Sequence, residues 1–203
     1  MPMKKAASVI SVLFHPLLMP TLGLMILLNS GSYVSLLDPA AKRAILFVMA
    51  LGTLVFPLMM LPIFFYRNLV LNQKGSVMEE RWIPRIIILI LYIITCIYFL
   101  RLPLNRIIQG YVLAVTATMA LFLLISIWVQ ISMHTAALGG LAGLVIALII
   151  FYGTQLEGFL LVVLLAGGLV GTARLLVGAH HPGEVYSGFV LGFMAVLGIL
   201  LLY

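Results

Sequence analysis

Charged residues are scarce in this chain of 203 residues, which has 11 Lys and Arg and 5 Asp and Glu, or 8% of the total. A soluble domain carries about 25% charged residues, so the chain lacks the charge to cover a water-exposed surface. Cysteine is nearly absent: Cys96 stands alone, which excludes a disulfide-stabilised scaffold. Hydrophobic residues make up 65% of the sequence, which excludes a disordered chain. The composition therefore predicts a protein whose surface faces lipid.

Long runs without charge follow one another along the whole chain. A helix needs about 20 apolar residues to cross a hydrocarbon core of about 30 Å. Seven runs approach or reach this length: Ala6–Asn29, Ala44–Tyr66, Ile86–Leu100, Ile107–Gln130, Thr135–Tyr152, Gly158–Ala173 and Val185–Tyr203. They leave only short connections. We therefore predict an all-α fold, a polytopic transmembrane bundle of six or seven spans that forms one integral membrane domain over residues 1–203.

The first run contains two prolines, Pro16 and Pro20. Each removes a backbone donor and clashes one turn back, so we expect a spanning helix that is kinked or broken near His15. The run over Ala6–Asn29 outlasts the apolar region of a signal peptide, and we interpret it as a membrane segment. His15 is interpreted first as a partner for backbone groups that the break frees, with a functional role as the alternative.

The last three runs each contain two glycines four residues apart. The pairs are Gly139 with Gly143, Gly167 with Gly171, and Gly188 with Gly192. Glycines at this spacing lie on one helix face and let two backbones approach closely, which favours helix association in lipid. We therefore expect these three helices to form a tightly packed unit.

The few ionisable and polar groups gather in three connections, and such groups are costly near a membrane unless they have a function. With seven spans, the connections after the second, fourth and sixth spans all emerge on the same side of the membrane. The three groups are therefore expected to converge on one site: Lys74 and Arg81; Ser132 and His134; Arg174, His180 and Glu184.

The chemistry of these side chains favours an oxyanion substrate. Lys74, Arg81 and Arg174 supply cationic donors that suit phosphate. His180 and Glu184 are four residues apart, so the carboxylate can meet the imidazole on one helix face, fix its tautomer and make the other nitrogen a nucleophile. His134 comes from a different connection and would protonate the leaving oxygen.

The order and spacing of these residues resemble the motifs of the type-2 phosphatidic acid phosphatase superfamily, which shares its site with vanadium-dependent haloperoxidases. Those motifs are Lys-x6-Arg-Pro, Pro-Ser-Gly-His and Ser-Arg-x5-His-x3-Asp, and the resemblance covers residues 74–184. The chain departs from them at five positions, none of which removes a charge or an imidazole: Trp82, Ile131, Met133, Ala173 and Glu184.

The resemblance implies a phosphatidic acid phosphatase-like core and a metal-independent hydrolase that needs no cofactor. Its substrate would be an anionic lipid phosphate or pyrophosphate, cleaved through a phosphohistidine. It implies that Lys74, Arg81 and Arg174 bind phosphate, Ser132 adds a hydrogen bond, His134 is the acid, His180 is the nucleophile and Glu184 orients it. The basic pI of about 9.7 fits membrane lipids with anionic headgroups, and no exposed basic domain is present to bind nucleic acid.

Several alternatives stay open. His181 competes with His180 as the nucleophile, and a metal site from His134, His180, His181 and Glu184 competes with the phosphate site, although three neighbouring cations would repel a metal ion. A non-catalytic lipid-phosphate-binding relative and a small membrane transporter are the rival functions. We expect a multi-pass protein of the bacterial cytoplasmic membrane. Seven Lys and Arg fall on the site side and four opposite, but removing the three phosphate-binding residues leaves four against four, so the side stays open.

Overall fold

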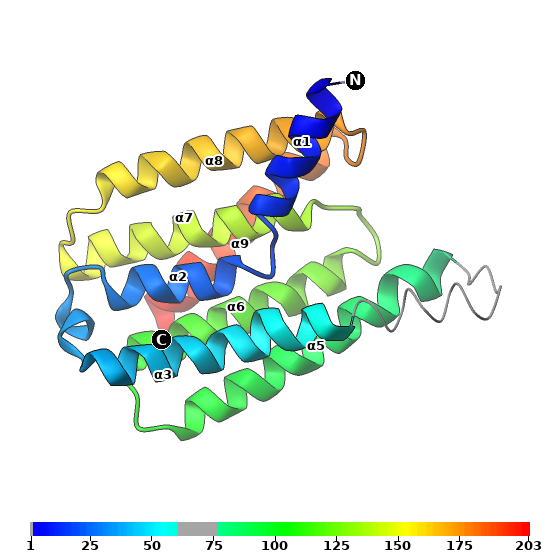
Figure 1. The fold of residues 1–203 in the computed structure, drawn as a ribbon. Helices are drawn as coiled ribbons and strands as arrows, with labels where there is room; N and C mark the ends of the chain where they lie inside the picture. Colours follow the sequence, from blue (N-terminus) through cyan, green and yellow to red (C-terminus); the bar gives the residue numbers. More distant parts are fainter. Residues whose placement is uncertain (1, 61–76) are drawn as a thin grey trace.

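The computed structural model describes the backbone of residues 2–60 and 77–203 and the side chains of residues 3–60 and 82–203. Within these ranges the regular structure is helical throughout (Figure 1). The long elements are α1 (Pro2–Leu13), α2 (Met19–Leu28), α3 (Pro39–Ala50), α5 (Val77–Arg101), α6 (Arg106–Ile125), α7 (Met133–Tyr152), α8 (Glu157–Leu176) and α9 (Pro182–Leu202). A short 3-10 turn, η1 (Tyr33–Leu36), precedes α3, and a π-helical turn, η2 (Leu51–Val55), continues it.

Six helices among the described residues are long and apolar enough to cross a membrane. They cover Pro39–Met60, Trp82–Arg101, Arg106–Ile125, Met133–Tyr152, Glu157–Leu176 and Pro182–Leu202. Twenty residues at about 1.5 Å per residue span about 30 Å, the thickness of the hydrocarbon core. Their outer faces carry large apolar side chains, such as Leu161 and Leu165 of α8, which are 58% and 61% exposed. The chain is therefore a multi-pass helical membrane bundle, as the composition predicts.

The first apolar run is divided into two short helices. α1 ends at Leu13 and α2 begins at Met19, so the break falls at His15 and Pro16, where the prolines predict it. α2 has 10 residues and covers about 15 Å, which is too short to cross the bilayer alone. In place of one spanning helix, α2 lies within the bundle against α3 and α7, whereas α1 is steeply inclined to it and packs on α8 (Figure 1).

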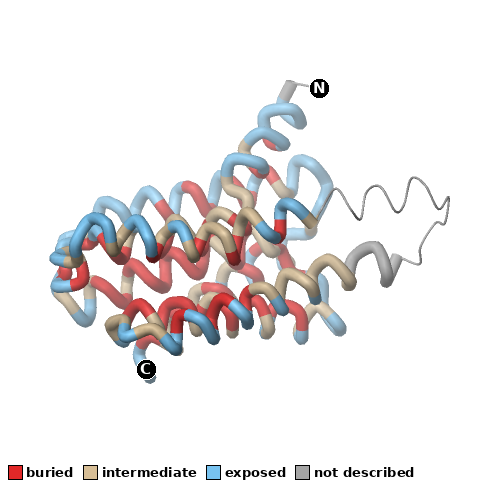
Figure 2. Tube along the Cα trace, turned by 60° about the horizontal axis from the view of Figure 1, so that its bottom comes forward, coloured by how far each residue is buried: buried red, intermediate tan, exposed pale blue. Residues whose placement is uncertain are grey.

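Glycines bring α7 and α9 into backbone contact, as their spacing predicts. A Cβ atom at Gly143 would lie 2.6 Å from the carbonyl oxygen of Phe193, and one at Gly188 would lie 2.5 Å from the carbonyl oxygen of Ser132. Both distances are too short for a real side chain. α7 is the most buried of the six spans among the described residues. Figure 2 shows the buried residues gathered along the middle of the bundle.

The connections divide between the two ends of the bundle (Figure 1). The α2–α3, α5–α6 and α7–α8 connections lie at one end. The α6–α7 and α8–α9 connections lie at the other end, where α5 also begins and α1 is placed. We call this second end the site end. The fold therefore brings the second and third groups of polar residues to the same end, as the parity of the spans predicts.

Candidate functional site

His180 and Glu184 form the best defined pair at the site end. Pro182 opens α9, and Glu184 stands in its first turn, where a carboxylate is favoured by the free amides of the helix N-terminus. The Nδ1 atom of His180 lies 2.7 Å from Oε2 of Glu184, and the two side chains are 17% and 19% exposed. The same oxygen accepts a hydrogen bond of 3.3 Å from the backbone amide of His181. With Nδ1–H donating to the carboxylate, the lone pair of His180 is on Nε2.

The turn that ends α8 places Arg174 and His180 at the same end of the bundle. Gly178 adopts a φ of +73°, which a residue with a side chain rarely adopts. Its amide donates to the carbonyl oxygen of Leu175 at 2.9 Å, and the amide of Ala179 donates to that of Arg174 at 3.1 Å. This is a Schellman cap, which reverses the chain directly after the last turn of α8. Arg174 is half-buried there, and its buried Nε atom has no hydrogen-bond partner among the described residues.

Ser132 joins the start of α7 to the start of α9. Its side chain is fully buried, and its backbone amide donates a 2.9 Å hydrogen bond to the carbonyl oxygen of Glu184. The Ser132 carbonyl oxygen accepts a hydrogen bond of 3.1 Å from the Thr135 hydroxyl, whereas the Ser132 hydroxyl has no partner within residues 3–60 and 82–203. Buried polar groups are normally hydrogen-bonded, so the Ser132 hydroxyl and the Arg174 guanidinium together offer unused capacity to a polar ligand.

His134 is the second residue of α7, and its ring contacts the first segment of the chain. Its Nε2 atom lies 3.2 Å from the carbonyl oxygen of Ser11 in α1. A carbonyl oxygen only accepts, so this contact places a proton on Nε2 and leaves Nδ1 of the neutral ring as an acceptor. Three further groups are near enough to interact electrostatically with His134: Arg174, His15 and His180. Two predicted histidines and one predicted arginine therefore share one region at the site end.

The remaining sequence predictions are placed as follows. Lys74 lies outside the described residues, and so does the side chain of Arg81, whose backbone is in the second turn of α5 at the site end. Arg85, in the third turn of α5, has its guanidinium carbon 5.5 Å from the ring centre of Phe122. His181 caps α9 with an exposed side chain, so it is His180 that meets the carboxylate. Among the described residues, no three His, Cys, Asp or Glu side chains are arranged to hold a metal ion.

The first segment contributes two features that the spacing of motifs does not reveal. The backbone carbonyl of Ser11 meets His134, and a backbone group carries no sequence signal. The ring of His15 meets the ring of His134 edge to face, with 5.9 Å between centres and 76° between planes. Burial lowers the pKa of His15 below its ordinary value of 6.5 and favours the neutral ring.

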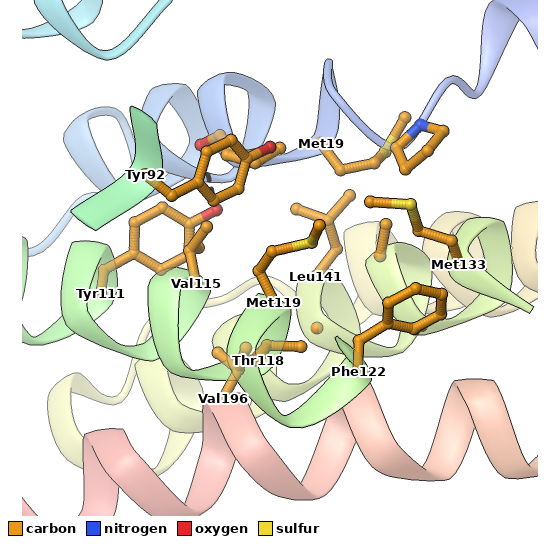
Figure 3. A pocket seen from close by; sticks show the side chains of 15 residues that line it. Met19, Tyr92, Tyr111, Val115, Thr118, Met119, Phe122, Met133, Leu141 and Val196 are labelled. Atoms are coloured by element: carbon orange, nitrogen blue, oxygen red, sulfur yellow. Dashed lines mark hydrogen bonds between the residues drawn. The ribbon is translucent and has the colours of Figure 1, made fainter. Parts of the chain in front are cut away.

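An apolar cavity of about 60 Å³ lies inside the bundle next to these histidines. Pro16 and Met133, the sequence neighbours of His15 and His134, line it, and Figure 3 shows Met133 on one side and Tyr111 on the other. The Tyr111 hydroxyl is already used, since it donates to the carbonyl oxygen of Pro20 at 3.0 Å. The cavity therefore suits a hydrocarbon group, and an anion would bind at the polar side chains beside it.

Comparisons of the chain with protein-family models, with curated proteins and with solved structures find no match.

Proposed function

We propose that this protein is a membrane phosphatase that hydrolyses a lipid phosphate or pyrophosphate through a phosphohistidine on His180. The observation that carries the proposal is the 2.7 Å contact between His180 and Glu184, at the same end of the bundle as His134 and Arg174 (Figure 1). A carboxylate on Nδ1 holds the imidazole in one tautomer and raises the nucleophilicity of Nε2. The order of the motifs, which resembles that of the type-2 phosphatidic acid phosphatases, supports the same assignment.

In the first step, Nε2 of His180 attacks phosphorus. A P–N bond forms and the P–O bond to the lipid breaks, while protonated His134 gives a proton from Nδ1 to the departing oxygen. Its Nε2–H stays on the Ser11 carbonyl oxygen, 3.2 Å away. The guanidinium of Arg174 and the hydroxyl of Ser132 donate to the phosphoryl oxygens, and Lys74 and Arg81 add positive charge in the same role.

In the second step, a water molecule attacks the phosphohistidine. His134, now neutral at Nδ1, takes a proton from this water as the P–O bond forms. The P–N bond breaks, its electron pair returns to Nε2 of His180, and inorganic phosphate leaves. Glu184 stays ionised throughout and stabilises the positive charge that His180 carries in the intermediate.

The position of the site supports a lipid substrate. The polar side chains lie at the ends of membrane-spanning helices, and the apolar cavity beside them suits a hydrocarbon group. In a lipid phosphate, the phosphate head would bind the polar side chains at the interface and the apolar tail would enter the cavity. Phosphatidic acid, phosphatidylglycerophosphate and polyprenyl phosphates or pyrophosphates all have this form.

The distribution of ionisable groups supports catalysis over transport. A transporter places such groups near the middle of the membrane on broken helices. Among the described residues, the Lys, Arg, Asp and Glu side chains of the six spans lie within about two turns of a span end, as Arg85, Glu157 and Arg174 illustrate. The break in the first segment lies beside the site and does not interrupt a span.

The test is phosphate release by the purified full chain in detergent, with a chelator present, from each of these lipid phosphates. We expect wild-type activity with the chelator, inhibition by vanadate, and loss of at least about 100-fold in His180→Ala and His134→Ala. His181→Ala, which changes the exposed neighbour, should keep the wild-type rate. Equal rates for wild type and His180→Ala would show that His180 is not the nucleophile. Activity that disappears with chelator and returns with zinc would replace the proposal by a metal mechanism.

A further inference from the structure

The inference concerns His15, which lies outside residues 74–184 and has no counterpart in the three motifs. It stands in the break between α1 and α2, half-buried, at the site end. Two independent contacts involve its ring: one with the backbone of its own segment and one with His134. Together these contacts indicate which tautomer of His15 is present and what the ring does at this position.

The first contact fixes the tautomer of His15. The backbone amide of Leu17 donates a hydrogen bond of 3.3 Å to Nδ1 of His15. A backbone amide cannot accept, so Nδ1 carries the lone pair and the single proton of the neutral ring is on Nε2. This contact satisfies a donor that the proline break leaves without a helical partner, which is the first of the two interpretations that the sequence suggests.

The second contact goes beyond that interpretation. The rings of His15 and His134 meet edge to face with centres 5.9 Å apart, the arrangement in which the positive edge of one ring faces the negative face of the other. On its other side, Nε2 of His134 is held at 3.2 Å by the carbonyl oxygen of Ser11. Both constraints on the His134 ring therefore come from the first segment, within five residues of chain.

The placement of the first segment gives these constraints a fixed base. α1 packs on α8, the helix that carries Arg174, and α2 packs on α7, the helix that carries His134. The segment is therefore tied on both sides of the break to the helices that supply the site. A ring held between Ser11 and His15 has one orientation relative to the nucleophile His180, which lies in the α8–α9 connection.

We propose that His15 is a positioning residue of this site, which holds the His134 ring in the orientation that proton transfer to the leaving oxygen requires. The proposal rests on the proposed function, because it assigns His15 a role through the general acid of that reaction. A purely structural His15 would serve the backbone amide of Leu17 alone. The two roles separate in the variant His15→Asn, because an asparagine side-chain oxygen can replace Nδ1 as the acceptor but offers no ring to His134.

The experiment uses two phosphate esters with apolar chains of equal length, one an alkyl phosphate and one an aryl phosphate. An alkoxide needs a proton to leave, whereas a phenoxide leaves readily without one, so a defect in the general acid slows the alkyl ester selectively. For His15→Asn we expect the kcat for the alkyl phosphate to fall by about tenfold or more, with KM and the thermal midpoint near wild type and the aryl rate nearly kept. His134→Ala should show the same selectivity more strongly, and Arg174→Gln, which weakens phosphate binding, should slow both esters alike.

The outcomes separate the two proposals. If wild type cleaves both esters and His15→Asn keeps the wild-type ratio of alkyl to aryl rates, His15 serves only the backbone and the inference is wrong. If His15→Asn slows both esters equally, the effect is general and the inference is also wrong. If wild type cleaves neither these esters nor the lipid phosphates, the proposed function itself fails, and the role of His15 in it fails as well.

Discussion

The backbone amide of Ser132 donates a hydrogen bond of 2.9 Å to the carbonyl oxygen of Glu184. These residues are 52 positions apart in the sequence, and each stands at the start of a membrane-spanning helix. The bond links α7, which carries His134, to α9, which carries Glu184, the partner of His180. It forms because Gly188, one turn after Glu184 in α9, has no side chain to hold α7 away.

Replacing this glycine tests the link. In Gly188→Ala, the new Cβ would lie 2.5 Å from the Ser132 carbonyl oxygen and 2.7 Å from the Thr135 hydroxyl oxygen, so α7 and α9 must move apart. We expect a loss of stability of about 1–3 kcal/mol, seen as a lower thermal midpoint in detergent, and a clear loss of phosphatase activity. Gly198→Ala in the same helix is the matched control, since nothing lies within 4 Å of its Cβ. Equal midpoints for the two variants would contradict close packing at Gly188.

The carboxylate of Glu184 is tested by an uncharged substitute of the same shape. Glu184→Gln removes the charge that the Nδ1–H of His180 faces at 2.7 Å. We expect kcat to fall by about 100-fold or more with KM little changed, because the amide no longer stabilises a positively charged imidazole. Glu157→Gln makes the same substitution in the first turn of α8, at the other end of the bundle, and should keep the wild-type rate. A Glu184→Gln enzyme with normal kcat would mean that the carboxylate only caps α9.

We predict that Arg174 contributes to binding of the phosphate group of the substrate. Its buried Nε has no hydrogen-bond partner in the part of the chain that the structure describes, so Arg174→Gln should cost little stability but remove a charged donor to phosphate. We expect KM for the lipid phosphate and the inhibition constant of vanadate both to rise by about tenfold or more. The control is Arg101→Gln, which removes an exposed arginine from the last turn of α5 at the opposite end. Unchanged vanadate inhibition in Arg174→Gln would separate this arginine from the anion site.

The buried state of His15 predicts how stability changes with pH. Because burial lowers the pKa of His15 in the folded protein, the unfolded chain takes up the proton first as the pH falls. The stability that depends on the neutral ring is fully present above about pH 6.5 and is lost as the pH falls below it. We expect the thermal midpoint of wild type to decrease between pH 7.5 and pH 5 more steeply than that of His15→Asn. Parallel decreases would show that His15 is not protected from protonation.

Most of the fold could be predicted from the sequence because one physical requirement dominates it. A chain with few charges and repeated apolar runs must place those runs across a bilayer, and the prolines at 16 and 20 locate the break in the first one. The ends of the helices were less predictable. α3 begins at Pro39, five residues before the start of the second uncharged run at Ala44, because Asp38 caps it: its Oδ1 atom accepts from the amide of Ala40 at 2.7 Å. A charged residue near a helix end can reach the interface, so a rule based on uncharged runs underestimates helix length.

The sequence could predict only those parts of the candidate site in which side chains with motif spacing contact each other. Residues four apart share one face of a helix, so the spacing of His180 and Glu184 predicts their contact. The contact forms at 2.7 Å, but His180 precedes Pro182, the first residue of α9, so the pair bridges the start of the helix and does not lie on one helix face.

The motifs could not predict the contacts that hold the His134 ring. These contacts come from the carbonyl oxygen of Ser11 and from the ring of His15, which is more than 100 residues away in sequence. Such contacts depend on how α1 folds back on the bundle, and hydrophobic patterns do not encode that direction.

The α6–α7 and α8–α9 connections, which carry the described motif residues, lie at one end of the bundle (Figure 1). This placement has a consequence for the compartment that receives the product. Cleavage at that end would deliver inorganic phosphate to one side of the bilayer and leave the dephosphorylated lipid in the leaflet on that side. In sealed vesicles, a substrate confined to the other leaflet would stay intact until it crossed the membrane. The geometry of the bundle would thus make the reaction vectorial.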